Sequence, residues 1–371
     1  MRTLSLRDTL ITNFSGEWGD ESKDSLGVYV LRTTNFTNSG DILYKNVITR
    51  IVPTNKIKQK RLNPGDIILE KSGGTKTTPV GRVVYFDNPE GIYLCNNFTQ
   101  VLRPNEEILD SKYLFYALYA KYQFHETDRL YNKTTGIQNL QLGRYLDLRI
   151  SVPDLIEQRN IRHQLDILHD AIAKKKKILE EIDNLVKSQF IEMFGGDQYP
   201  DCQIKELVAE RVESVRKRYK PEDRIRYVDI SSIDNKLNQM TGYTEYMLKD
   251  APSRAQQCIE KGDILVSTVR PNLRNIAINT FDDDRMVASS GFCVLRVTSC
   301  NRSYLFAALL LDNFSRKMSE LTTGANYPAI KDSDVLGYRI PRPPIERQNE
   351  FARFVEQTDK SKNGSEMEVA A

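Results

Sequence analysis

The chain has 371 residues, of which 28% are charged and 40% hydrophobic, with a formal net charge of +3. That length allows two domains with separate cores, and the composition is typical of a globular protein. No apolar run approaches 18 residues, the five cysteines form no C-x-x-C pair, the three histidines are scattered, and the first residues carry no secretory signal. We therefore expect a cytoplasmic protein without a membrane span or a metal site.

The first part of the chain reads as a series of strands followed by a helix. Short runs of Val, Ile, Tyr and Phe, such as "VYVLRTTNF", "DIILEKSGG", "RVVYF" and "YLCNNFTQVLRP", are bounded by Gly, Pro, Asn and Asp. The segment Ser111–Phe124 has few breakers and the aromatic and leucine spacing of a buried helix. We predict an α+β domain over residues 1–152, with a mixed or antiparallel sheet.

The clearest helix in the chain comes next, at residues 153–196. Asp154 is the expected N-cap, and Gly195 with Gly196 is the expected stop after Phe194. Apolar residues at alternating spacings of four and three form a heptad seam: Ile161, Leu165, Leu168, Ile172, Leu179, Ile182, Val186 and Met193. A helix from Leu155 to Phe194 would be about 60 Å long.

A second unit at residues 197–340 repeats the plan of the first. Its expected strands are "YVDISSI", "GDILVSTVR", "IAINTF" and "FCVLRV", and its expected helix is "SYLFAALLLDNFSRKMSEL". Residues 341–362 follow as a second, shorter helix, with Phe351 and Val355 at positions that match Ile161 and Leu165. Asn363-Gly364 is expected to end this helix and begin a tail at 363–371.

Three sequence echoes identify a duplication. The segments "TTGIQNLQLGRYLDLRISVPDLIEQ", "NPGDIILEKSGG" and "KYLFYALY" return in equivalent positions as "TTGANYPAIKDSDVLGYRIPRPPIERQ", "EKGDILVSTVRP" and "SYLFAALL", 188–197 residues later. A repeat of this length is a whole domain rather than a solenoid unit. The two long helices are therefore expected to form an antiparallel coiled coil. Because the second helix is shorter, the seam from Ile172 to Met193 is expected to need cover from another polypeptide or from a second copy of the chain.

Four loops carry the candidates for DNA binding. Small residues allow close backbone approach, hydroxyls and basic groups suit phosphates, and Asn, Gln and Arg suit base edges. The candidates are Lys71, Ser72, Lys76, Thr77, Arg82, Gln138, Asn139, Arg270, Asn272, Arg274, Asn326 and Tyr327. Solvated turns would have the same composition, so recurrence in both units is what favours binding.

Catalytic motifs are not found in the sequence. It has no G-x-x-x-x-G-K-[ST] loop, no G-x-G-x-x-G after a strand, no P-D…E-x-K nuclease cluster and no [DN]-P-P-[YFW] tetrapeptide. We expect a protein that is not an enzyme by itself. The alternative hypothesis is an assembly adaptor whose coiled coil is the functional part and whose domains bind protein; a stand-alone methyltransferase is disfavoured by the missing tetrapeptide.

The linkers "VPDLIEQRNI" and "IPRPPIERQNEF", with "GDIILEKSGGTKTTPVGR" and the Thr-Thr-Gly turns, resemble the specificity subunit of type I restriction–modification systems. The resemblance covers about residues 1–362, and the second helix is shorter than the family pattern. It implies two target-recognition domains that each read one half of a bipartite DNA sequence. It also implies helices that set the spacer and dock methyltransferase subunits, which carry S-adenosylmethionine. Motor–nuclease subunits would add ATP and Mg²⁺, and this chain would bind no cofactor.

Overall fold

The chain was described from a computed structural model that covers residues 2–22, 27–75, 78–87, 90–132, 137–323 and 328–370, with backbone only at 361 and 363–370. It divides into two compact units, Met1–Ala173 and Lys174–Ala371. Both units mix helices with sheets that contain antiparallel and parallel strand pairs. The predicted α+β class is confirmed.

The described residues of unit 1 form two four-stranded sheets and two smaller ones. In the first sheet β10 pairs with β2 and β6, and β6 with β8; in the second, β4 and β9 pair in parallel. The sheets are β2 (Leu10–Ser15), β10 (Thr99–Pro104), β6 (Ile67–Glu70), β8 (Val83–Tyr85); β3 (Asp20–Glu21), β5 (Ile48–Ile51), β4 (Val28–Leu31), β9 (Tyr93–Cys95); β11 (Tyr131–Asn132), β12 (Gln138–Leu140), β7 (Ser72–Gly73); and β1 (Arg2–Ser5), β13 (Arg149–Val152). Its helices are α1 (Thr54–Lys60), α2 (Ser111–Gln123) and α3 (Leu142–Leu146).

Unit 2 repeats this plan with a different periphery. The buried strand β20 pairs with β21 and β23 as β6 pairs with β8 and β10, and β15 pairs in parallel with β22 as β4 does with β9. The sheets are β16 (Ile233–Asp234), β17 (Gln239–Met240), β21 (Ile276–Ile278), β20 (Ile264–Ser267), β23 (Phe292–Leu295); β18 (Thr244–Met247), β15 (Arg224–Val228), β22 (Met286–Ser289), β19 (Ala255–Cys258); and β14 (Asp201–Gln203), β24 (Arg339–Pro341). Its own helices are α5 (Val215–Arg218), α6 (Arg302–Leu309), α7 (Asp312–Glu320), α8 (Asp332–Leu336) and α9 (Ile345–Ala370).

The helix predicted across residues 303–321 is broken into α6 and α7, which corrects that prediction. Leu309 and Phe314 are both buried, at 1% and 2% exposure. Five residues along one continuous helix would place them about 140° apart, since each residue turns the helix by about 100°. The break at Leu310 and Leu311 lets both side chains enter the same core.

The duplication extends to individual buried ion pairs. Asp66 accepts two hydrogen bonds from the Arg103 guanidinium, each 2.8 Å long, and Asp263 accepts two from Arg296, at 3.0 and 2.8 Å. Both carboxylates also accept a backbone N–H three residues earlier. The "GDI" echo in the sequence is therefore a turn held by a buried carboxylate in each unit.

Helix α4 (Leu155–Phe194) has the predicted bounds. The Asp154 carboxylate accepts the backbone N–H of Glu157 at 2.9 Å, which is an N-cap bond. At the other end Gly196 adopts a φ of +75°, a conformation that favours glycine. The sequence signals at both ends are thus confirmed.

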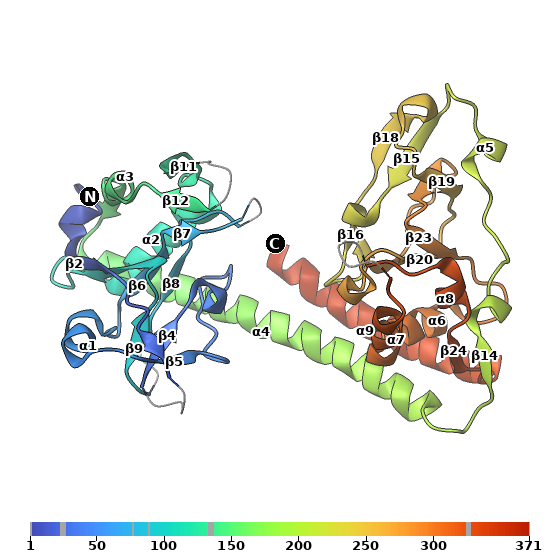
Figure 1. The fold of residues 1–371 in the computed structure, drawn as a ribbon, viewed down its shortest axis with the longest axis horizontal. Helices are drawn as coiled ribbons and strands as arrows, with labels where there is room; N and C mark the ends of the chain where they lie inside the picture. Colours follow the sequence, from blue (N-terminus) through green and yellow to red (C-terminus); the bar gives the residue numbers. More distant parts are fainter. Residues whose placement is uncertain are drawn as a thin grey trace. The chain divides into compact units, whose positions relative to one another are not determined.

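Helix α9 packs along the C-terminal part of α4 within unit 2 (Figure 1). Phe351 contacts Phe190 and Phe194, Val355 and Val186 pack on the same core, and Lys362 pairs with Asp183. Numbers rise along α9 as they fall along α4, so the pairing is antiparallel.

Two predictions about these helices are wrong. First, α9 continues through Asn363-Gly364 to Ala370, because a helical glycine costs only about 1 kcal/mol and good helix formers follow it. Second, the seam is covered near Met193, which is buried in unit 2 and needs no other polypeptide there. The sequence comparison matched equivalent residues of the two helices, whereas antiparallel packing brings the start of one against the end of the other.

Candidate nucleic-acid interface

In unit 1 the two predicted binding loops meet in one small sheet. Strand β12 pairs with β7, so that Asn139 lies opposite Ser72 and Gln138 opposite Gly73 (Figure 1). The Ser72 hydroxyl donates to the Asn139 side-chain oxygen at 2.7 Å, and Asn139 is exposed. The half-buried Gln138 amide instead accepts from the Val80 backbone and donates to the Thr75 carbonyl, at 3.2 Å each. Asn139 is therefore the better placed of the two amides to meet a ligand.

Lys71 lies at the base of this sheet. Its ammonium donates to the Ser15 hydroxyl at 2.6 Å and to the Gln100 side-chain oxygen at 3.3 Å. Burial lowers the pKa of Lys71 from its ordinary value. Gln100 in turn donates to Asn13 at 2.8 Å, so a polar network extends behind the loops. Asn13, Ser15 and Gln100 were not among the predicted residues because they lie on strands. The sequence does not show which face of the sheet their side chains are on.

Arg82 supports the loop from within. Its three guanidinium nitrogens donate to the buried Glu70 carboxylate at 2.7 Å, to the carbonyls of Phe36 and Thr33, and to the Asn38 side chain. Only 13% of the side chain is exposed. Arg82 therefore holds the loop in place and is not placed to contact DNA, which corrects its selection as a DNA-contact candidate. Its position in a polar, glycine-containing loop gave no sign of these internal partners.

In unit 2 the equivalent loop is short and contains two arginines in the left-handed conformation. Arg270 has a φ of +49° and Arg274 a φ of +54°, on either side of a single helical turn. Arg274 pairs with Asp312 at the start of α7, at 2.7 Å. Non-glycine residues with positive φ are uncommon and cluster where a site requires a fixed backbone. Asn272, between them, is exposed.

Two asparagines of the β16–β17 hairpin brace this loop. Asn235 donates to the Leu273 carbonyl at 2.8 Å, and Asn238 donates to the carbonyls of Arg274 and Ile276. The Arg270 N–H donates to the Pro328 carbonyl at 2.8 Å, which joins the loop to the segment after the second Thr-Thr-Gly sequence. The same two segments therefore meet in both units. Lys76, Thr77, Asn326 and Tyr327, also candidates, lie outside the described residues.

The predicted seam residues of the helices have unequal environments. Leu165 packs on the core of unit 1, Val186 and Val355 on that of unit 2, and Met193 and Phe351 are buried in unit 2. Ile161, Leu179 and Ile182 are half-buried, whereas Leu168 and Ile172 are exposed by 58% and 46%. Ile167, Ile178 and Leu185, outside the predicted seam, are exposed as well. Helix α4 thus keeps an apolar surface beyond the part that α9 covers.

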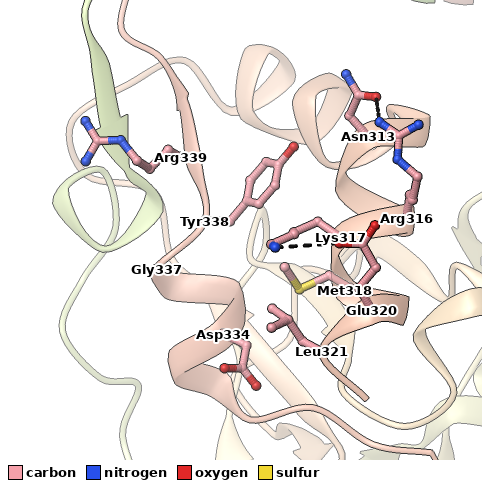
Figure 2. A pocket seen from close by; sticks show the side chains of 10 residues that line it. All are labelled: Asn313, Arg316, Lys317, Met318, Glu320, Leu321, Asp334, Gly337, Tyr338 and Arg339. Carbon is pink, nitrogen blue, oxygen red and sulfur yellow. Dashed lines mark hydrogen bonds and ion pairs between the residues drawn. The ribbon is translucent and has the colours of Figure 1, made fainter.

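A hollow of about 460 Å³ lies on unit 2 between α7 and the α8–β24 turn (Figure 2). Arg316, Lys317 and Arg339 line it together with the carboxylates of Glu320 and Asp334, and Lys317 pairs with Glu320 at 3.6 Å. The Tyr338 ring lies between Arg339 and the α7 side chains (Figure 2). The mixture of charges leaves the hollow only slightly basic and offers no arrangement for nucleophilic catalysis.

Four of the five cysteines in the described part of the chain are buried, and none forms a disulfide. Burial raises the pKa of the Cys95 thiol to about 12 and that of Cys258 to about 11, so both stay protonated and unreactive near neutral pH. No group of three His, Cys, Asp or Glu residues that could hold a metal ion occurs among the residues that the structure describes. Within the same described ranges, no helix has the length and apolar character needed to cross a membrane.

Comparison with protein families decides the identity of the two units. The model of the type I restriction modification DNA specificity domain matches residues 19–184 and again 209–369. The chain belongs to this family. The duplicated unit seen in the sequence and in the buried contacts is thus the DNA specificity domain, present twice, and the predicted resemblance is confirmed.

Individual relatives are distant. The chain is 23% identical over 290 residues to the type I restriction enzyme MjaVIII specificity subunit of Methanocaldococcus jannaschii. This alignment covers 70% of this chain and 65% of the relative. It is 22% identical over 335 residues to the StySPI specificity subunit of Salmonella potsdam, covering 82% of this chain and 70% of the relative. The matched region is thus less than two thirds of the MjaVIII subunit.

A solved structure has the same fold. The S subunit of the type I restriction–modification system from M. genitalium aligns with a TM-score of 0.54 and 15% identity, over 100% of this chain and 92% of that one. At this identity the similarity concerns the fold alone. In each specificity domain of the present chain, the loop after the central buried strand is joined to the segment after the Thr-Thr-Gly sequence, which makes that junction the candidate DNA interface.

Proposed function

We propose that this chain is the DNA sequence-specificity subunit of a type I restriction–modification complex, with each specificity domain reading one half of a bipartite target. The observation that carries the proposal is the recurrence of one loop junction, β7 with β12 in unit 1 and Val269 with Ala329 in unit 2, in two domains of the DNA specificity family. The junctions differ in side chains while their backbone pairing is shared. Equivalent scaffolds with different exposed residues suit two different half-sites.

Helix α4 would set the distance between the half-sites. Its 40 residues correspond to about 60 Å of helix, which exceeds one turn of DNA. The exposed apolar residues of α4 would dock methyltransferase subunits that carry S-adenosylmethionine. Motor–nuclease subunits would supply ATP and Mg²⁺. In this assembly the present chain is not itself catalytic and binds no cofactor, and it acts in the cytoplasm, where the DNA is.

The test is to map methylated bases in DNA from cells that express the chain with its methyltransferase partners. We expect a motif of two short specific blocks around a fixed gap. Asn139→Ala should relax one block and Asn272→Ala the other, because a lost base contact costs about 1–3 kcal/mol of discrimination at that position. Gln164→Ala, an exposed position on α4, serves as the control and should leave both blocks unchanged.

Two results would contradict the proposal. Methylation without a split motif would mean that the two domains do not read separate half-sites. Relaxation of both blocks by either single variant would mean that the loops act on the complex as a whole and do not each contact one half-site.

A further inference from the structure

An exposed aromatic side chain stands beside the unit 1 junction. Phe98 lies in the turn between β9 and β10 and is 43% exposed. The turn is fixed by Thr99, whose N–H and hydroxyl both donate to the Asn96 carbonyl, at 3.1 and 2.7 Å. A single exposed hydrophobic residue is ordinary. The position of Phe98, rather than its exposure, requires an explanation.

The backbone of Phe98 is tied directly to the candidate interface. Its carbonyl accepts the N–H of Lys71 at 3.0 Å and that of Ser72 at 3.1 Å. Ser72 in turn bonds to Asn139 across the β7–β12 pair. The Phe98 backbone is thus linked through Ser72 to Asn139, the exposed amide that is best placed to read a base.

Unit 2 makes the same turn without an aromatic residue. Gly291 is the equivalent of Phe98, and its carbonyl accepts the N–H and hydroxyl of Thr268 at 2.9 and 3.0 Å. A Cβ built on Gly291 would meet only ordinary contacts, the nearest at 3.4 Å. The turn therefore forms with or without a side chain there, and folding does not explain why unit 1 has a phenylalanine.

We propose that Phe98 is a specificity-determining residue of the first half-site, where its ring packs against the C5-methyl group of a thymine in the major groove. The inference rests on the proposed function. An asparagine amide pairs with the adenine edge in that groove, and an apolar side chain beside it contacts the thymine methyl. Asn139 and Phe98 together would read a half-site that contains adenine and thymine. Unit 2, with Gly291, lacks this contact.

The test measures binding of the assembled complex, chain plus methyltransferase subunits, to duplexes in which deoxyuridine replaces each thymine of the first half-site in turn. Deoxyuridine removes only the methyl group. For the native chain we expect one position at which affinity falls about fourfold, the loss expected for one buried methyl. For Phe98→Ala the same substitution should have no effect, and its affinity for the thymine duplex should match that of the native chain for the uracil duplex.

Phe124→Ala is the matched control, because Phe124 is also exposed, by 77%, and lies at the end of α2. It should keep the native response to deoxyuridine. The inference is overturned if Phe98→Ala loses the same affinity as the native chain on removal of the methyl, if no thymine position responds, or if the first block contains no thymine. Failure of the proposed function is distinguishable, since the native complex would then show no sequence-selective binding at all.

Discussion

The Glu70–Arg82 ion pair holds the binding loop of unit 1, whereas the equivalent residues of unit 2 form no ion pair. In unit 1 the buried carboxylate pairs with the guanidinium at 2.7 Å, and the Glu70 and Arg82 backbones also bond. The same backbone bond joins Ser267 to Asn275 in unit 2, where no charge is present at either residue. The backbone geometry is shared, while the charged pair braces only the longer loop of unit 1.

Arg82→Ala should destabilise unit 1 on the order of 3 kcal/mol, because it leaves the Glu70 carboxylate buried without its cation. The double variant Glu70→Ser with Arg82→Asn, which copies unit 2, should be destabilised less than Arg82→Ala alone. Urea unfolding followed by circular dichroism measures both. An equal loss in the two variants would mean that Arg82 acts through packing on Phe36 and not through charge.

The same variant has a pH signature. Burial raises the pKa of Glu70 and the hydrogen bond from Arg82 lowers it, with burial the larger effect. Without Arg82 the pKa of Glu70 in the folded state rises further above its value in the unfolded state. Between these two pKa values the folded state keeps a proton that the unfolded state releases, so stability falls as pH rises from the lower value to the higher. The gap between Arg82→Ala and the native chain should therefore widen from about pH 5 to about pH 8.

Residue roles at the interface were the least predictable from sequence. The segments around Ser72 and Asn139 could be named as binding loops from their composition, and the structure brings them together. Whether a basic residue in such a loop faces outward depends on a partner that is distant in sequence. For Arg82 that partner set includes Thr33, Phe36 and Asn38, more than 40 residues away, and no local pattern marks them.

At the scale of elements, two glutamines attach the long helices to their domains. Gln158 and Gln348 are 0% and 3% exposed. Each accepts a backbone N–H from the residue that caps the domain's own helix, Asp110 before α2 and Asn301 before α6, at 2.8 Å. Each also donates to a carbonyl of the preceding proline segment. The repeated Pro…Glu-Gln sequence therefore fixes the direction in which each helix leaves its domain.

Replacing either glutamine by alanine should cost about 1–3 kcal/mol for each backbone group left buried without a partner. Gln158→Ala should destabilise unit 1 and Gln348→Ala unit 2, by similar amounts. Limited proteolysis can locate the loss, because the affected unit should be cleaved first. The control is Gln164→Ala on the exposed face of α4. Cleavage of both units at the same rate in either variant would contradict a local attachment.

The helices themselves were more predictable than their breaks. Asp154 and the Gly195-Gly196 pair act through local bonds and local backbone conformation, so the bounds of α4 could be predicted. The division between α6 and α7 is set by the need to bury Leu309 and Phe314 in one core. Helix α9 continues past Asn363-Gly364 because the small local free-energy cost of these two residues is offset by the good helix formers that follow. Neither outcome can be predicted from a local sequence pattern, since each depends on the balance with other residues.

For the molecule as a whole, the duplication was the strongest sequence signal, because the two units use the same residues for the same buried contacts. The Asp–Arg pairs and the two glutamines occupy matching places in both units. The repeat could not predict which residues of the two helices meet, since alignment shows which residues are equivalent and not which are close in space. That is why the cover of Met193 by unit 2 was missed.

The proposed role of α4 as a continuous element through both specificity domains can be tested by a proline at Ile182. An interior proline removes a helical hydrogen bond and costs about 3 kcal/mol or more. Because Ile182 is half-buried and lies near the Asp183–Lys362 ion pair, Ile182→Pro should also disturb the antiparallel packing of α9. Ile182→Ala removes only the side chain and serves as the matched control.

We expect Ile182→Pro to abolish assembly with the methyltransferase subunits, measured by size-exclusion chromatography with light scattering, while Ile182→Ala weakens it at most slightly. Both units should still fold, because the buried clusters around Tyr145 in unit 1 and Phe292 in unit 2 do not include Ile182. Assembly that is unchanged by the proline would show that docking uses the domains and not the continuous helix.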